Sequence, residues 1–214
     1  LCMPQVDYEF ANYGGLRGVI SKNFISNDKG EYLVSGNELL KIANSISRDL
    51  VHQRIKRVYL VMEYLIEKKP LGFNALSNIK KAGEFFLGYL MLDALISNQD
   101  RHNENWGMIQ TVNGNRHLAL TFDHGASLGK NITDEEKNDR LNTKDPKRSV
   151  SAYTARAKSW FYLENDKSTR LKVIDAFIEF GRYYPAAYKA WIRRLVKIEN
   201  ESIRSIIWRI PEEL

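Results

Sequence analysis

The sequence has a single cysteine and no long hydrophobic run, and both absences exclude classes of protein. Cys2 is the one cysteine among 214 residues, so an internal disulfide framework is excluded and a reducing compartment is favoured. No apolar run approaches about 20 residues, and no basic segment followed by an apolar one opens the chain. We therefore expect a cytoplasmic protein with neither a membrane span nor a secretory signal.

Long blocks of charge of one sign are also absent. The 32 basic and 26 acidic residues are interspersed, and the net charge of +6 indicates no more than a mild affinity for anions. Nucleic acid is therefore not expected as a direct partner. With 43% hydrophobic residues, the chain can bury one good core or two small lobes. Because it begins at Leu1 and not at a methionine, we expect it to be part of a longer chain.

Hydrophobic periodicity predicts strands at the start of the chain and helices after them. Residues 5–25 alternate apolar and polar side chains around the sequence NYGGLRG, which predicts a hairpin with a glycine-rich connection. The spacing then becomes helical, with Leu39 and Leu40 on the inner face of a short helix. A further helix is expected from about residue 55 to 66, where KKPLG ends it. A third, from about residue 83 to 96, is apolar over most of its circumference and belongs in the middle of a core.

The polar stretch NQDRHNENWG, residues 98–107, follows this helix and leads into a second hairpin. Its strands are predicted at residues 106–112 and 116–123, with a turn at NGN between them. Residues 130–150 are polar and are expected to form a mobile surface segment. Residues 151–214 have the spacing of three or four amphipathic helices, and the predicted fold class is α+β, mainly helical. Four aromatic residues of this last part are expected in the core: Trp160, Phe161, Trp191 and Trp208.

The polar stretch carries the residue types that phosphoryl transfer requires. Such a site needs a carboxylate to orient or deprotonate the acceptor hydroxyl, together with an amide oxygen and a second carboxylate as ligands of Mg²⁺. Asp100 and Asn105 supply the first two in the D-x-x-x-x-N spacing of a kinase catalytic loop. Asp123 ends the second strand of the predicted hairpin, which would fold it back beside Asn105.

Each of these residues also has a simpler structural interpretation. Asp100 is a favoured N-cap residue for a short helix, and Asp123 suits the start of a turn. His102 is as consistent with a structural hydrogen bond as with a contact to a ligand. The joint spacing of the three oxygen-bearing residues, after a buried helix and across a hairpin, favours the catalytic interpretation of the loop. His52 and His117 are interpreted as surface or packing residues.

Two stretches resemble loops of a known kinase superfamily. NQDRHNEN and FDHGASLG resemble the catalytic and metal-binding loops of the HipA-like serine/threonine kinases, whose pattern is N-x-D-x-H-x-x-N followed by an aspartate on a strand. They also resemble the loops of the phosphatidylinositol 3- and 4-kinases, D-R-H-x-x-N and D-F-G-x-x-L-G. GGLRGVISKNFI and GEYLVSGNELL are similar to the passage from the small lobe into the large lobe of bacterial HipA-like proteins, which favours that family.

The resemblance implies a protein-kinase-like large lobe with a remnant of the small β lobe. Residues 1–35 would be the end of the small lobe and the hinge, and residues 36–214 the helical large lobe that contains both loops. Asp100 would be the catalytic base, and Asn105 and Asp123 the ligands of Mg²⁺.

The resemblance also implies where the nucleotide binds. His102 would lie close to it, and the segment SKNF, residues 21–24, would be the hinge whose backbone meets adenine. Lys22 and Phe24 are therefore assigned to nucleotide binding, and ATP and Mg²⁺ are the implied cofactors.

Two elements of these kinases are not recognisable in the sequence, namely the phosphate-covering loop and the strand lysine of the small lobe. Lys22 is expected on a strand but at the hinge, so it is not assigned as that lysine. Three functions remain open. We favour a HipA-like kinase that phosphorylates Ser or Thr of a protein substrate, with the segment after Asp123 facing that substrate. The others are a phosphoinositide-type lipid kinase, and an inactive kinase-like module of a toxin–antitoxin system that binds an antitoxin-like partner.

Overall fold

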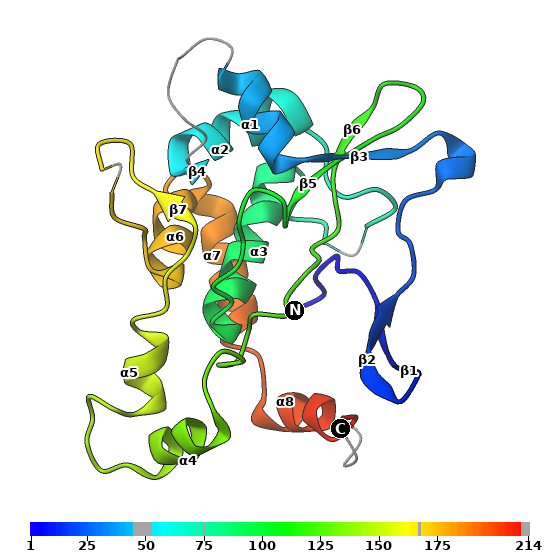
Figure 1. Cartoon of the computed structure of the whole chain (residues 1–214). Coiled ribbons are helices and arrows are strands. Elements are labelled where there is room, and N and C mark those ends of the chain that lie inside the picture. The colour runs from blue at the N-terminus through cyan, green and yellow to red at the C-terminus, as the bar shows by residue number, and fades with distance from the viewer. Residues whose placement is uncertain (45–52, 75, 167, 211–214) are drawn as a thin grey trace.

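The computed structural model arranges its helices and strands around one long central helix (Figure 1). The residues that it describes are 1–44, 53–74, 76–166 and 168–210. Helix makes up 40% of the structure and strand 17%, so the regular structure is mixed and mainly helical, as the sequence predicts. His52, interpreted above as a surface or packing residue, lies outside the described residues.

The first element is the predicted two-stranded hairpin. Strands β1 (Tyr8–Tyr13) and β2 (Leu16–Ser21) pair antiparallel along their whole length. Gly14 and Gly15 both have positive φ, 58° and 79°, which glycine adopts readily and which two-residue hairpin turns require. The prediction that Lys22 lies on a strand is wrong, because the ladder and the strand both end one residue before it.

A three-stranded antiparallel sheet carries the second predicted hairpin. β5 (Gly107–Gln110) and β6 (Arg116–Leu118) form that hairpin, and β3 (Tyr32–Ser35) pairs with the other edge of β5. β3 is not predicted from the sequence, because four residues are too few to establish an alternation. β6 ends earlier than predicted, and the chain beyond it makes a parallel bridge between Thr121 and Gln5.

The first three helices lie where the sequence predicts them. α1 (Gly36–Asn44) and α2 (Ile55–Val61) are followed by the long helix α3 (Ala82–Ile96). α2 continues directly into a π-helical turn, η2 (Met62–Ile66), so the predicted helix from residue 55 to 66 is one continuous helical segment with a change of hydrogen-bond pattern.

The last part of the chain contains the predicted helices and one unpredicted strand. Helix α5 (Val150–Thr154) is short, and β7 (Phe161–Tyr162) follows it. Helices α6 (Val173–Gly181), α7 (Pro185–Leu195) and α8 (Asn200–Ile207) complete the described chain. No described helix has the length and the apolar composition that crossing a bilayer demands.

α3 lies at the centre of the hydrophobic core. Its buried side chains include Phe85, Phe86 and Tyr89, and α6, α7 and β6 all pack against it. Gly88 lets the ring of Trp191 in α7 approach closely, since a Cβ at that position would lie 2.5 Å from the tryptophan Cζ2. The predicted central helix is therefore confirmed, and it fixes the position of the loop that follows it.

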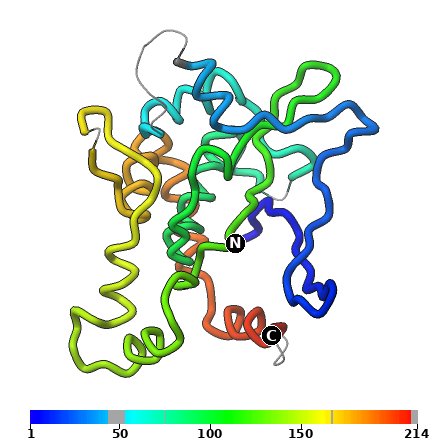
Figure 2. The backbone as a smooth tube through the Cα atoms, in the orientation of Figure 1, coloured from blue at the N-terminus to red at the C-terminus, as the bar shows by residue number. Residues whose placement is uncertain are grey.

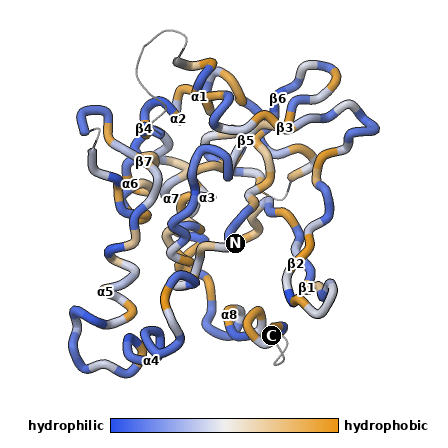
Figure 3. The backbone as a smooth tube through the Cα atoms, viewed as in Figure 1, coloured by the Kyte–Doolittle hydropathy of each residue, from blue (hydrophilic) through white to orange (hydrophobic). Residues whose placement is uncertain are grey.

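Residues 130–150 lie on the surface, as expected, but they contain a helix that the sequence analysis misses, α4 (Asp134–Asn142). The Thr133 hydroxyl caps it by accepting the backbone N–H of Glu136 at 3.2 Å. Three acidic residues in its first turn complement the helix dipole, and Arg140 pairs with Glu136. α4 is therefore stabilised by polar interactions and not by an apolar face, which is the feature that hydrophobic periodicity detects. Figure 3 shows the segment as hydrophilic.

The four aromatic residues predicted in the core divide into two pairs. Phe161 and Trp191 are fully buried, so the prediction is confirmed for them. It is wrong for Trp160 and Trp208, which are 38% and 85% exposed. Trp160 directly precedes Phe161 of β7, and successive residues of an extended chain point to opposite faces. Trp208 directly follows α8, which packs extensively against no other described element.

Candidate active site

The candidate site begins where α3 ends, because the last turn of that helix leads the chain into the polar loop. Ser97, directly after α3, has a positive φ of 52°. The buried carboxylate of Asp93 accepts a hydrogen bond of 2.8 Å from the side-chain amide of Asn98. Asn98 Oδ1 in turn accepts the backbone N–H of Asp100 at 3.2 Å. The central helix therefore fixes the backbone that carries the Asp100 side chain.

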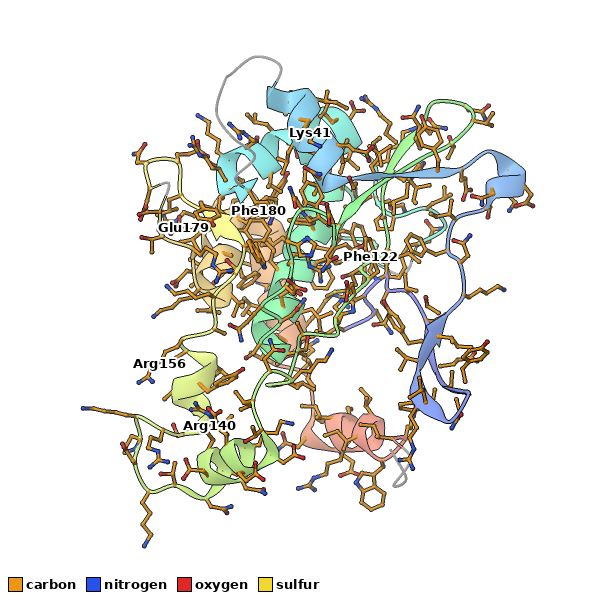
Figure 4. The ribbon with its side chains drawn as sticks, viewed as in Figure 1. Lys41, Phe122, Arg140, Arg156, Glu179 and Phe180 are labelled. Atoms are coloured by element: carbon orange, nitrogen blue, oxygen red, sulfur yellow. The ribbon has the colours of Figure 1, made fainter. Side chains whose placement is uncertain are left out.

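Arg101 joins the helix, the loop and the hairpin through one buried guanidinium. It forms a two-point ion pair with Asp93, in which the Nε–Oδ2 and Nη2–Oδ1 distances are both 2.8 Å. Its Nη1 donates to two backbone carbonyls, that of Asn105 at 2.8 Å and that of Phe122 at 3.2 Å. Phe122, labelled in Figure 4, directly precedes Asp123. The arginine thus holds the loop and the Asp123 segment against each other.

The positive charge of Arg101 is maintained in spite of its burial. Burial disfavours the charged guanidinium, but the charge and the hydrogen bonds of Asp93 outweigh this effect, so the pKa of Arg101 is raised. Neither residue of this pair is predicted from the sequence to have a role. A signal was present, because Asp93 is the one acid in the otherwise apolar run FFLGYLMLDALI.

Asn105 leaves its amide oxygen free. The side chain is buried, and Nδ2 donates to the backbone carbonyl of Asp100 at 2.8 Å. This hydrogen bond fixes the orientation of the amide, and no donor from the described part of the chain contacts Oδ1. A free amide oxygen is the group that a magnesium ligand must offer.

Asp123 lies one residue past the carbonyl that Arg101 binds. Its φ is positive, 54°, a conformation that aspartate tolerates better than most residues but that still stores some strain. Its backbone N–H donates to the hydroxyl of Tyr8 at 2.9 Å, so the N-terminal hairpin contacts the site. Across the described residues, nothing forms a hydrogen bond or ion pair with its exposed carboxylate. A turn at residues 125–126 follows Asp123, so this residue can precede a turn and also offer its carboxylate to a metal ion.

Asp100 and His102 lie side by side in the loop. No helix follows Asp100 before β5, so its interpretation as an N-cap residue is wrong. The Asp100 side chain is 42% exposed, and His102 Nε2 lies 3.9 Å from its Oδ1. His102 Nδ1 accepts the backbone N–H of Glu104 at 3.2 Å, which leaves the proton of a neutral ring on Nε2. His102 therefore has a structural hydrogen bond, and its contact with a nucleotide stays a prediction.

His124 is a partly buried neutral group beside Asp123. Burial lowers the pKa of His124 to about 4, and the positive charge of Arg101 lowers it further than burial alone. Its Nε2 forms a hydrogen bond of 2.9 Å with the hydroxyl of Thr121. The ring is uncharged at neutral pH, so it adds no positive charge next to the Asp123 carboxylate. His117, by contrast, packs with Nδ1 2.9 Å from the carbonyl of Lys69, in keeping with its interpretation as a packing residue.

Gln53 supports the loop from a distant part of the sequence. It belongs to the two-residue strand β4 (Gln53–Arg54), which pairs in parallel with β7. Its Nε2 donates to the backbone carbonyl of Arg101 at 2.9 Å, and its Oε1 accepts the indole N–H of Trp106. All three side chains are buried. Nothing in the local sequence around Gln53 signals this role.

The predicted hinge borders a small cleft with a mixed polar and apolar lining. The ring centroids of Phe24 and Phe122 are 5.7 Å apart. The cleft, of about 180 Å³, lies between the sheet and the segment that contains the short helix η1 (Asn27–Lys29). Its lining residues are Phe24, Ser26, Lys29, Glu31, Leu71, Ile109, Leu118 and Leu120. Lys22 is exposed, and no described contact brings it to the predicted catalytic or metal-binding residues.

The donor chemistry of Asn105 and Asp123 fits Mg²⁺. In phosphotransferases this ion uses one or two carboxylates together with phosphate oxygens, and not a complete cage of protein ligands. The residues that the structure describes accordingly contain no group of three or more His, Cys, Asp or Glu placed to hold a metal ion. A magnesium ion bound by these two residues would complete its coordination with water or phosphate oxygens.

Known proteins resemble this chain in structure and not in sequence. No protein-family model matches it, and no curated protein matches it in sequence. Among solved structures, the Helicobacter pylori proinflammatory kinase CtkA is similar with a TM-score of 0.58 and 18% identity, over 92% of this chain and 72% of that chain. HipA of Shewanella oneidensis MR-1, solved as a toxin–antitoxin complex with HipB and operator DNA, gives a TM-score of 0.45 and 11% identity. That match covers 94% of this chain and 48% of HipA.

The chain has a kinase-like fold. The similarity to CtkA establishes this, and at 18% identity it establishes the fold alone. The expectation of a kinase-like fold is thereby confirmed. The division at residue 35 into the end of a small lobe and a large lobe stays a prediction, as does the wider relation to the phosphatidylinositol kinases.

Proposed function

We propose that the protein is an ATP-dependent phosphotransferase that moves the γ-phosphoryl group to a serine or threonine hydroxyl of a protein substrate. The kinase-like fold supports this proposal. The observation that carries it is the buried Arg101, whose Nη1 binds the carbonyls of Asn105 and Phe122. A free amide oxygen and a free carboxylate thereby stand on adjoining segments, beside the loop that carries Asp100.

In this proposal, Asp100 orients the acceptor hydroxyl and takes up its proton. Its partly exposed carboxylate has one described polar contact, the 3.9 Å approach of His102 Nε2, and is otherwise open to a substrate. In the transfer, the acceptor oxygen forms a bond to the γ-phosphorus, the bond from that phosphorus to the β–γ bridging oxygen breaks, and ADP leaves. Because Arg101 is buried, its part is to position the loop and not to contact the phosphates.

Asn105 and Asp123 would hold Mg²⁺ through their free oxygens. The ion supplies charge neutralisation at the phosphate oxygens when it is bound. The positive φ of Asp123 supports this role, because strained backbone is retained mainly where function requires it.

The cleft beside Phe24 would take the adenine ring between its apolar side chains, with the backbone of the hinge, including Lys22, along its edge. The kinases that the sequence resembles also use a phosphate-covering loop and a strand lysine. Activity as proposed requires these two groups from outside the 214 residues. Their absence from the sequence also favours a second candidate, a kinase-shaped module without catalysis that binds an antitoxin-like protein partner.

The experiment that tests the proposed function measures ATP turnover by the full-length natural protein and by Asp100→Ala and Asp123→Ala. Each variant is expected to lower turnover by about 10²-fold or more. Arg193→Gln, at an exposed position of α7, is the control and should retain full activity. Mass spectrometry for phosphoserine and phosphothreonine, beside a phosphoinositide assay, identifies the acceptor class. Turnover that survives in both aspartate variants would exclude this chemistry.

Thermal denaturation with and without Mg-ATP separates the enzyme from the second candidate. A site that binds nucleotide must stabilise the fold when it is occupied. We expect Mg-ATP to raise the Tm of the natural protein and of Asp100→Ala, and Asp123→Ala to lose the part of the shift that depends on Mg²⁺. A full-length protein whose Tm does not change with Mg-ATP, but which binds a protein partner, would instead support the binding module.

A further inference from the structure

A second, smaller pocket lies beside the same loop, on the side of the segment that follows Asp123. Its volume is about 110 Å³, and it is lined by Gln99, Arg140, Tyr153, Arg156 and Ala157. Gln99 directly precedes Asp100. The two arginines, labelled in Figure 4, come from α4 and from the chain just after α5. The pocket therefore adjoins the residue that would orient the acceptor hydroxyl, and we call it the Arg156 pocket.

The polar groups of the Arg156 pocket are arranged as hydrogen-bond donors. Gln99 Oε1 accepts the backbone N–H of Lys158 at 3.2 Å, which turns its Nε2 toward Tyr153 Oη, 3.4 Å away. Because Tyr153 Oη accepts from Gln99, its own O–H remains to donate elsewhere. None of the lining side chains is acidic. A set of donors without a carboxylate is suited to an anion.

The two arginines of the pocket have different roles. Arg140 is already engaged in contacts within the protein. Its Nη2 and Nε lie 2.6 and 3.2 Å from Glu136 Oε1, and its guanidinium lies 4.9 Å from the Tyr153 ring centroid. Arg156 is exposed, and its guanidinium has no hydrogen-bond or ion-pair partner among the residues described. Arg140 therefore builds the wall of the pocket, and Arg156 is available to a ligand.

Three of the four acids of α4 pair with basic residues of the same surface segment. Glu136 pairs with Arg140, and Asp139 pairs with Arg148 at 2.7 Å. Asp134, at the start of the helix, pairs with Lys137 at 2.9 Å. Glu135, the fourth acid of the helix, is not among the residues that line the pocket, so the charge of Arg156 gives the pocket a positive potential.

We propose that the Arg156 pocket binds a phosphate or carboxylate group of the acceptor polypeptide. The protein would then select acceptors with an acidic or phosphorylated side chain close to the target hydroxyl. Charge-assisted hydrogen bonds to arginine are among the strongest that a protein makes, and the tyrosine and glutamine donors add direction to them. This inference rests on the proposed function, because it assumes that Asp100 holds the hydroxyl one residue away from Gln99.

The binding step can be tested without any phosphoryl transfer. A fluorescent peptide of glycine, alanine and one phosphoserine is titrated with the full-length natural protein, previously treated with phosphatase, and its anisotropy is recorded. We expect Arg156→Gln to weaken binding about tenfold, the effect of losing one charged hydrogen bond. Arg193→Gln removes an equal charge from an exposed position of α7 and should change the affinity less than twofold. Equal weakening by both variants, or equal binding of the unphosphorylated peptide, would overturn the proposal.

The selectivity can be tested in the kinase assay. The ratio of kcat/KM for serine peptides with and without a neighbouring acidic or phosphorylated residue is measured for the same proteins. That ratio should exceed one in the natural protein and in Arg193→Gln, and should fall about tenfold in Arg156→Gln. An unchanged ratio in Arg156→Gln removes the proposed selectivity. If no protein transfers phosphate to any peptide, the proposed function fails, and the anisotropy measurement still decides whether the pocket binds anions.

Discussion

Among single residues, Asp93 controls the geometry of the site most directly. Its buried carboxylate accepts two hydrogen bonds from Arg101 and one from Asn98, and both of these partners position the loop. A buried ion pair adds little net stability over an apolar pair of the same size, but removal of one partner strands the other charge in the interior. The pair therefore matters chiefly because it fixes where the loop lies.

Asp93→Ala is expected to lower the free energy of unfolding by about 3–5 kcal/mol, because Arg101 would keep its charge without a counterion. Urea denaturation measures this change. Glu201→Ala, which removes an exposed ion pair of 3.7 Å with Arg204, is the control and should have little effect. If the two variants lose similar amounts, the buried pair does not hold the structure as argued.

His124 makes the stability of the fold depend on pH. Burial and the charge of Arg101 lower its pKa to about 4, from 6.5. Below pH 6.5 the His124 ring of the unfolded chain binds a proton, whereas the ring in the folded protein stays neutral down to about pH 4. The contribution of His124 to stability is therefore complete above pH 6.5 and is lost as the pH falls from 6.5 to about 4. The loss is on the order of 3 kcal/mol. Urea denaturation between pH 7 and 4 should give a shallower dependence for His124→Gln, and parallel curves would contradict this assignment.

At the scale of elements, α3 and α7 pack closely against each other. The Trp191 ring lies against Gly88, and its indole N–H donates to the backbone carbonyl of Glu84 at 2.8 Å. Two preferences compete at this glycine. Alanine is the better helix former by about 1 kcal/mol, but its methyl group would overlap the ring. The ring cannot move without breaking its own hydrogen bond, so the cost of the overlap should exceed the gain in helix propensity.

Gly88→Ala is therefore expected to destabilise the protein by about 1–3 kcal/mol, the usual cost of overpacking a core. Chemical denaturation provides the measurement. Gly18→Ala, in β2, is the matched control, since no atom lies within 4 Å of its added methyl group. A stabilised Gly88→Ala protein would show that the two helices are not packed this closely.

The elements that the sequence predicts are those whose formation depends on apolar periodicity. α3 is recognisable because its side chains are apolar on nearly every face, and the first hairpin because two glycines separate alternating strands. β3 and α4 are missed for different reasons. Four residues cannot establish an alternation, and α4 is held by its Thr133 cap and by ion pairs.

The candidate site divides in a similar way. Asp100, Asn105 and Asp123 can be nominated from their spacing, because the chemistry dictates which oxygens are needed and how the hairpin would return. The residues that position them cannot be nominated so easily. Gln53 contacts the loop from 48 residues away, and that contact exists only in the folded chain. A lone acid in an apolar helix, as at Asp93, is the one positioning signal that the sequence offers.

At the scale of the whole molecule, the N-terminal hairpin and the site are coupled by one hydrogen bond. Figure 2 shows the hairpin, α4 with α5, and α8 extending from the same end of the body in that view. Both strands of the hairpin are largely exposed, yet the Tyr8 hydroxyl accepts the backbone N–H of Asp123. This contact ties the predicted remnant of the small lobe to the predicted metal-binding loop.

Tyr8→Phe is expected to speed hydrogen exchange at the Asp123 amide about three- to tenfold, since a typical hydrogen bond contributes 0.5–1.5 kcal/mol. NMR-detected exchange measures this rate. Tyr13→Phe removes a hydroxyl from the exposed tip of the same hairpin and serves as the control. An equal rate in both variants would mean that the hairpin does not restrain the loop.

Arg101 binds the loop and the Asp123 segment only through main-chain carbonyls. These hydrogen bonds do not depend on which side chains stand at positions 105, 122 and 123. The part of the scaffold that Arg101 holds is therefore separable from the proposed metal-binding carboxylate of Asp123. If the proposed function holds, substitution of Asp123, whose exposed carboxylate has no described partner, should yield a folded protein without turnover, which makes it a reporter of chemistry and a suitable bait for trapping a bound acceptor.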